Sequence, residues 1–114
     1  MSIFPKKLIK GQDKFTTFHM KICNNSNENI EGKINYKVTL PDGKIDEMCF
    51  DRVEKIPAKS EFNQYDKYYI KPKNPTGRYH VEGRFFWNGE NILSETNETD
   101  FFDVEEYYWE KLMV

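Results

Sequence analysis

Hydrophobic and polar residues alternate most regularly between Ile30 and Leu40. The two parities are cleanly separated, with Ile30, Ile34, Tyr36 and Val38 on one and Glu31, Lys33, Asn35 and Lys37 on the other. A period of two predicts a strand with one face toward water. Pro41-Asp42-Gly43 follows directly and predicts a chain reversal, because proline fixes φ and glycine accepts positive φ. We therefore expect a hairpin into residues 44–50.

The same alternation recurs elsewhere, with turn signals between the segments. Phe18, Met20 and Ile22 alternate with polar residues, and residues 24–29 after them are too polar to be buried. Residues 78–87 alternate again, and Asn88-Gly89 predicts a two-residue hairpin turn at their end. Further strands are expected at residues 4–9, at a sheet edge, and at 62–70, 92–93 and 100–105.

This succession of short strands favours a sandwich or barrel over an α/β arrangement, since no amphipathic helix stands out in the body of the chain. The 114 residues, 16% of them aromatic, suffice for one hydrophobic core. The sequence thus predicts one domain, 1–114, with about seven to eight strands. Its core spans roughly residues 15–105, and a C-terminal tail, 106–114, extends the last strand or forms a turn or two of helix.

The segment Thr76-Gly77-Arg78-Tyr79-His80-Val81 resembles the tyrosine corner of immunoglobulin-type folds. With Leu40-Pro41-Asp42-Gly43-Lys44, Ile56-Pro57-Ala58-Lys59-Ser60 and Asp100-Phe101-Phe102-Asp103-Val104-Glu105, the layout resembles bacterial immunoglobulin-like and fibronectin-type modules. The resemblance implies an all-β, single antiparallel immunoglobulin-like β-sandwich, in which the Tyr79 hydroxyl bonds to nearby backbone. Val81 stands where antibody domains carry a cysteine, so their inter-sheet disulfide has no counterpart here. Modules of this kind serve many roles.

Charge and hydropathy exclude several classes of partner. The 17 basic and 19 acidic residues give a net charge of -2 and are interspersed, so no concentrated basic face for nucleic acid is expected. No apolar run reaches the length of a signal-peptide core or a membrane span, which predicts no membrane insertion and a cytoplasmic location, with an exported mature form as the alternative. Heavy use of Asn, Lys and Ile is typical of an AT-rich bacterial genome.

Candidate catalytic chemistry is sparse. His19 and His80 are the only histidines, and Cys23 shares a strand face with His19 at about 13 Å, too far for direct activation. There is no metal-ligand spacing and no glycine-rich phosphate loop. We therefore predict a non-catalytic chain without a metal or cofactor. Cys23 and Cys49 are expected as reduced thiols, with one disulfide as the alternative in an exported protein.

Aromatic residues are the enriched chemical resource. Tyr79, Phe85 and Trp87 share the core parity, whereas other rings fall on the opposite parity or in the tail. These form the candidate interface: Phe86, Phe101, Tyr107, Tyr108 and Trp109. An exposed patch of rings often marks an interface. The leading hypothesis is a non-catalytic protein–protein interaction module whose partner is another protein or a second copy of the chain. The alternative is that the tail covers an open end of the sandwich.

Two other binding functions compete with this hypothesis. A carbohydrate-binding module would stack sugars on Trp109 or on a cluster among Tyr65, Tyr68 and Tyr69. An immunoglobulin-like protease inhibitor would present the proline-stiffened loop 71–76 to an active site. An enzyme is the fourth and weakest interpretation.

Overall fold

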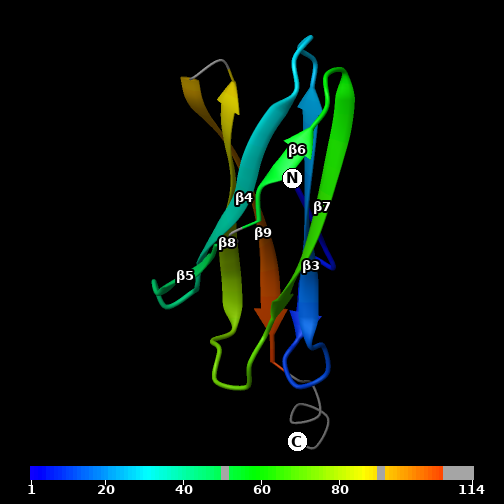
Figure 1. Ribbon diagram of the computed structural model, residues 1–114. Helices are drawn as coiled ribbons and strands as arrows, with labels where there is room; N and C mark the ends of the chain where they lie inside the picture. Colours follow the sequence, from blue (N-terminus) through cyan, green and yellow to red (C-terminus); the bar gives the residue numbers. More distant parts are fainter. Residues whose placement is uncertain (50–51, 90–91, 107–114) are drawn as a thin grey trace, which may run out of the picture.

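The computed structural model describes residues 1–49, 52–89 and 92–106, with the backbone alone at 88–89 and 92–96. This part of the chain is all-β and contains no helix, and hence none long and apolar enough to cross a membrane (Figure 1). The strands are β1 (Ser2–Phe4), β2 (Lys7–Ile9), β3 (Phe15–Asn24), β4 (Ile30–Thr39), β5 (Ile45–Met48), β6 (Glu54–Ile56), β7 (Ser60–Tyr69), β8 (Gly77–Gly89) and β9 (Ile92–Glu105).

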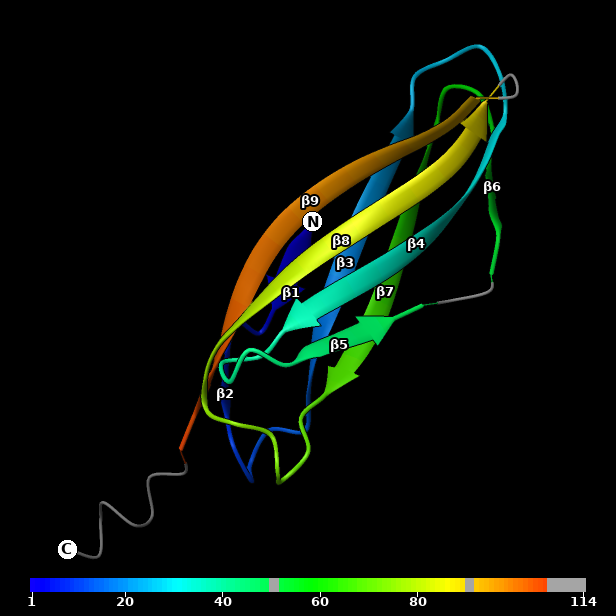
Figure 2. The ribbon, with the colours of Figure 1, turned by 90° about the vertical axis from the view of Figure 1, so that its left-hand side faces the viewer.

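The strands form two sheets that pack face to face. One has three strands in the order β1-β3-β7, and the other has the order β2-β9-β8-β4-β5, with β6 also paired to β4. In Figure 2 the larger sheet faces the viewer, and β3 and β7 lie behind it. The expectation of an all-β domain is confirmed. The described residues form nine strands instead of seven or eight, and the β2–β9 pair is parallel, so the wholly antiparallel arrangement was wrong.

The single edge strand expected at residues 4–9 is two strands in different sheets. β1 pairs with β3, whereas β2 pairs with β9. Pro5 stands between them and carries no amide hydrogen, so it cannot continue the ladder of β1. The N-terminal segment therefore borders both sheets along one side of the molecule.

The core lies between the sheets and is rich in rings. Phe18 of β3 contacts Tyr36 of β4 at 5.1 Å and Phe102 of β9 at 6.1 Å between ring centroids. The inward parity of each long strand supplies the remaining buried side chains, as the alternation predicted. The largest of them are Tyr36, Tyr79, Phe18, Phe85, Phe102, Leu8, Met20, Ile34 and Ile56.

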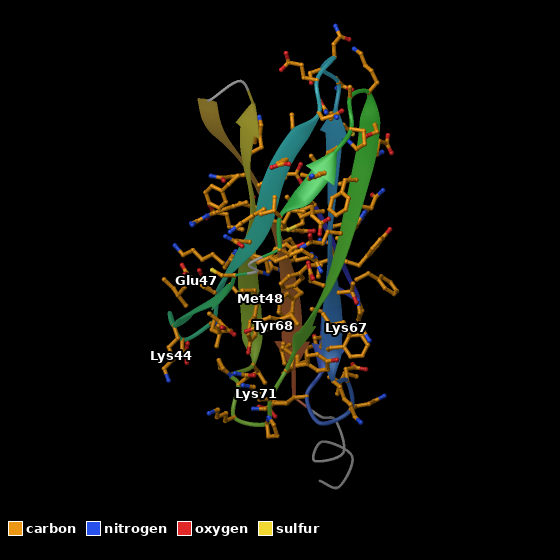
Figure 3. All side chains as sticks on the ribbon, viewed as in Figure 1. Lys44, Glu47, Met48, Lys67, Tyr68 and Lys71 are labelled. Carbon is orange, nitrogen blue, oxygen red and sulfur yellow. The ribbon has the colours of Figure 1, made fainter. Side chains whose placement is uncertain are left out.

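Two buried tyrosines bond through their hydroxyls near the edges of this core. Tyr79 donates to the Pro75 carbonyl at 2.6 Å, the contact that the resemblance implied. Burial raises the pKa of Tyr79 to about 12, and the charge of Asp42 contributes. Tyr68 donates to Asp46 Oδ2 at 2.9 Å and so links β7 to β5 across the two sheets. Figure 3 shows Tyr68 on the inward side of β7 and Lys67 on the other side.

Strands β8 and β9 form one long hairpin that differs from the expected layout. Asn88 and Gly89 lie within β8, and the pairing of Gly89 with Ile92 places the connection at residues 90–91, outside the described residues. The strands expected at 92–93 and 100–105 are one continuous strand, paired to β8 throughout. The polar run between them lacks the apolar alternation that predicts a strand, yet its backbone completes the ladder with β8.

Asn24 corrects the expectation that residues 24–29 are all solvent-exposed. Its side chain is 4% exposed. Its amide nitrogen donates to the carbonyls of Glu28, Ile56 and Pro57 at 2.8–3.0 Å, and its Oδ1 accepts from the amide and hydroxyl of Ser26. One side-chain amide therefore connects the β3–β4 loop to the end of β6. The alternation of apolar and polar residues could not predict this contact, because Ile56 and Pro57 are distant from Asn24 in the sequence.

Replacing Asn24 by alanine is expected to lower the free energy of unfolding by about 2–3 kcal/mol, because the buried carbonyl of Ile56 loses its hydrogen bond to this side chain and others weaken. Asn25→Ala is the matched control, since the Asn25 side chain is exposed. Urea denaturation of the two variants measures the difference. Equal losses would contradict the role assigned to Asn24.

Candidate binding surface

The outer face of the three-stranded sheet gathers aromatic side chains from all three of its strands. In the strand register, Phe4 lies opposite Thr17, Phe15 opposite Tyr69, and His19 opposite Tyr65. Since successive side chains of a strand point to opposite faces, these residues share the face that points away from the core. We call this surface the aromatic face, formed by Phe4, Phe15, His19, Tyr65, Lys67 and Tyr69.

Three side chains of the aromatic face are unusually open to solvent. Phe4 is 80% exposed, Tyr65 65% and Tyr69 57%. Isolated apolar residues at a surface are ordinary, but several exposed rings gathered on one sheet face are a feature of interaction sites. The aromatic face spans three neighbouring strands, and along β7 it runs from Tyr65 to Tyr69. A surface of these dimensions covers a few hundred Å², which suits a short ligand or peptide.

Contacts among the rings order one end of the aromatic face. Phe15 and Tyr69 pack with centroids 5.6 Å apart and planes tilted by 52°. Lys67 Nζ lies 4.6 Å from the centroid of Phe15, so a cation covers one side of that ring. This end therefore offers apolar surface beside a positive charge.

The other end of the aromatic face is organised around His19. Its ring stacks on Tyr65 with centroids 4.4 Å apart and planes within 5°. Its Nε2 bonds to Asn63 Oδ1 at 2.8 Å, and its Nδ1 lies 3.3 Å from the Ser2 hydroxyl. Both ring nitrogens thus have partners, and the imidazole is held in one orientation. This arrangement presents a fixed aromatic pair with polar groups on either side.

The interface residues predicted from sequence are not brought together into one patch. Phe86 and Phe101 both lie on the outer face of the six-stranded sheet, and both are partly buried. Phe86 pairs with residue 95 and so lies six positions from Phe101 along β9, a separation of about 20 Å. Tyr107, Tyr108 and Trp109 lie outside the described residues.

Phe101 is covered by two cations. Arg78 lies 3.9 Å and Lys6 4.7 Å from its ring centroid. Lys6 also pairs with Asp100, and Arg78 donates two hydrogen bonds to Asp103 at 3.0 and 3.3 Å. The ring is therefore part of a surface charge cluster, which argues for a local packing role.

The Arg78 hydrogen bonds hold the pKa of Asp103 below its ordinary value of 3.8. A carboxyl with a lowered pKa in the folded state stabilises the fold above pH of about 4, and this contribution is lost as the pH falls toward the folded pKa. We expect Asp103→Asn to be less stable than the wild type at pH 6 and to lose less stability between pH 4 and 2. Unfolding curves at several pH values measure this, and parallel pH profiles would contradict it.

A shallow depression of about 520 Å³ lies on the outer face of the six-stranded sheet. Its lining is mostly polar and includes Lys37, His80, Glu82 and Thr99. Arg84 donates to Glu82 at 2.8 Å, and this bond lowers the pKa of the Glu82 carboxyl. This surface thus carries the bonded Glu82 carboxyl beside other polar and charged groups, and among the residues that line it there is no cluster of open rings like that of the aromatic face.

The residues considered for chemistry are dispersed. His19 and Cys23 both project from the outer side of β3, where they pair with Tyr65 and Glu61 respectively. His80 lies on the other sheet, opposite Phe101. Cys23 and Cys49 are both free and exposed. Within the ranges that the structure describes, no group of three His, Cys, Asp or Glu side chains is arranged to hold a metal ion.

The loop considered for protease inhibition is held by its own hydrogen bonds. The Lys71 amide donates to Asn74 Oδ1 at 2.6 Å, and the Asn74 amide donates to the Lys71 carbonyl at 3.0 Å. Tyr79 bonds to Pro75 at the end of the loop. Lys71, Pro72 and Lys73 are exposed at its tip.

Sequence reasoning found part of the aromatic face and missed the rest. Tyr65 and Tyr69 were named with Tyr68, but Tyr68 is 5% exposed and belongs to the core. Residues 65 and 69 are an even number of positions apart and therefore point to the same face of β7, whereas residue 68 points to the opposite face. Phe4 and Phe15 were missed because each begins or ends a strand, where alternation is too short to assign a face.

Comparison with models of known protein families gives no match, and comparison with curated proteins finds none similar to this chain.

Proposed function

We propose that this chain is a non-catalytic, immunoglobulin-like binding module that uses its aromatic face to bind a protein partner through an extended peptide segment. The observation that carries the proposal is the cluster of Phe4, Tyr65 and Tyr69 on one face, each more than half exposed. Aromatic side chains supply large contact areas and are enriched at the centres of protein interfaces.

The free edge of β7 supports a peptide as the ligand. In the three-stranded sheet, β7 pairs with β3 on one side and has no second neighbour among the described strands. An extended peptide added to such an edge gains backbone hydrogen bonds, and every second side chain falls on the same face as Tyr65 and Tyr69. Backbone pairing would then supply affinity, while the rings and Lys67 select side chains.

The immunoglobulin-like assignment is part of the proposal. It is supported by two facing sheets, by the connection of consecutive strands across them, and by the hydrogen bond from Tyr79 to Pro75. In sandwiches of this type the sheets form a scaffold, and binding is a property of one surface or loop set.

A carbohydrate ligand is the second candidate, because Tyr65 and Tyr69 are open on the same sheet face. Two features favour a peptide instead. Lys67 already covers one side of Phe15, and His19 covers one side of Tyr65, which leaves less free ring surface for stacking a sugar. The free edge of β7 offers backbone groups that a sugar cannot pair with in a ladder.

Selection of a random peptide display library on the immobilised chain, in parallel with a glycan array, tests the proposal. We expect enriched peptides that alternate apolar and polar residues and that fail to bind the Tyr65→Ala/Tyr69→Ala variant. Glycan signals that disappear in that variant, with no enriched peptide, would replace the protein partner by a carbohydrate. Peptides that bind the variant as well as the wild type would contradict the aromatic face.

A further inference from the structure

A second opening lies on the side of the molecule where the two sheets separate. It is a cleft of about 460 Å³, within the range of ligand-binding pockets. Apolar side chains from three strands line it, namely Ile22, Ile30, Phe85 and Trp87, and Lys21, Cys23 and Glu98 lie along its rim. Trp87 stacks on Phe85 with centroids 5.6 Å apart, which continues the core into the cleft.

The edge of β3 beside this cleft is open. β1 covers only three residues of this edge, because its pairing with β3 begins at Phe4 opposite Thr17 and ends at Ser2 opposite His19. Met1 then packs over Gly83 together with Met20, and its amino group pairs with Glu98. Beyond this point no described strand lies next to residues 21–24 on that side of β3. The backbone groups of this edge and the apolar floor of the cleft are therefore available to one and the same ligand.

An extended chain fits both features at once. Paired with the edge of β3, it would continue the line of β1, and alternate side chains would point inward against Ile22 and Trp87. The ligand that fits this site is therefore a short extended segment with large apolar side chains at every second position.

Residues 107–114 of this chain, Tyr-Tyr-Trp-Glu-Lys-Leu-Met-Val, meet that demand. Six of the eight are apolar or aromatic, and Tyr107 and Trp109 fall on the same parity. We propose that the cleft binds the C-terminal segment 107–114 of a second copy of this chain, added as a strand to the edge of β3.

Reach excludes Tyr107 and Trp109 of the same molecule from this cleft. Glu98, on the rim of the cleft, is seven residues from Glu105 along β9, a distance of about 23 Å. Tyr107 and Trp109 lie within about 14 Å of Glu105 even when the chain is fully extended, so they cannot return to the cleft. Two copies side by side in opposite directions bring each C-terminal segment to the other's cleft, as a closed two-fold dimer requires.

Disulfide trapping in the full chain tests the pairing directly. One protein carries Cys49→Ser, so that Cys23 at the cleft is its single thiol; the other carries Cys23→Ser, Cys49→Ser and Glu110→Cys. Glu110 has the parity opposite to Trp109 and would therefore lie on the outer face with Cys23. We expect the mixed, oxidised proteins to form a reducible heterodimer at least ten times faster than a mixture in which Cys49 is the only thiol of the first protein. Equal rates would overturn the proposal.

Light scattering supplies the second readout. The full chain at about 100 μM is expected to be a dimer, and both the chain ending at Glu106 and the full-length Tyr107→Ser/Trp109→Ser variant are expected to be folded monomers. A monomeric full chain, or a dimer that persists in the full-length variant, would overturn the inference. The cleft and the aromatic face are different surfaces, so either proposal can fail while the other stands.

Discussion

Replacing Phe102 by alanine is expected to lower the free energy of unfolding by about 3–5 kcal/mol. Phe102 is fully buried. Its ring stacks on Tyr79 at 4.8 Å and contacts Tyr68 and Phe18, which belong to the other sheet. Its removal would leave a cavity between the sheets, and the loss is large beside the total of about 5–15 kcal/mol typical of such domains.

Phe101→Ala is the matched control for this prediction. Phe101 precedes Phe102 on β9 but points outward, where it contacts Arg78 and Lys6. Cation–π contacts at exposed sites contribute about 0.5–1 kcal/mol each, so we expect a loss of no more than about 1 kcal/mol. Urea denaturation monitored by circular dichroism measures both variants. Losses of similar size would contradict the assignment of inward and outward faces on β9.

The double variant Tyr65→Ala/Tyr69→Ala is expected to weaken binding of peptides selected on the wild-type chain by about 30-fold or more. Central aromatic residues of an interface typically contribute 2 kcal/mol or more, and these two are the exposed tyrosines of the aromatic face. Both side chains are more than half exposed, so the free energy of unfolding should change by about 1 kcal/mol at most. Isothermal titration calorimetry gives the affinities.

The Phe101→Ala variant again serves as the comparison, because it removes a ring from the opposite face of the molecule. Its affinity for the same peptides should match that of the wild type. If Phe101→Ala weakens binding and the double variant does not, the outer face of the six-stranded sheet is the binding surface, and the interface predicted from Phe86 and Phe101 replaces the aromatic face.

The sequence predicted most of the strands because apolar alternation is a direct consequence of a sheet with one buried face. The segment 30–40 illustrates this, since its expected strand and the turn at Gly43 both occur in the structure. The prediction failed where backbone pairing, and not side-chain burial, defines the strand. The polar middle of β9 is paired to β8 throughout, and β2 joins β9 in parallel through only three residues.

The candidate surface was harder to predict than the fold. Whether an outward ring is open or covered depends on neighbours that are remote in the chain: Lys6 and Arg78 cover Phe101, whereas Phe4 has a largely exposed ring. The alternation of residues along one strand shows which face a side chain points to, but it carries no information on such contacts. Asn24 is a further example, because its burial depends on the carbonyls of Ile56 and Pro57, more than thirty positions away.

Mapping a bound peptide by two-dimensional ¹H–¹⁵N NMR tests the central claim most directly. A peptide selected on the wild-type chain, titrated into the labelled protein, should shift the amide signals of β7 and of the neighbouring part of β3, with the largest changes near Tyr65, Lys67 and Tyr69. The signals of His80 and Glu82, on the outer face of the other sheet, should stay unchanged. Shifts concentrated at His80 and Glu82, with β7 unaffected, would contradict binding at the aromatic face.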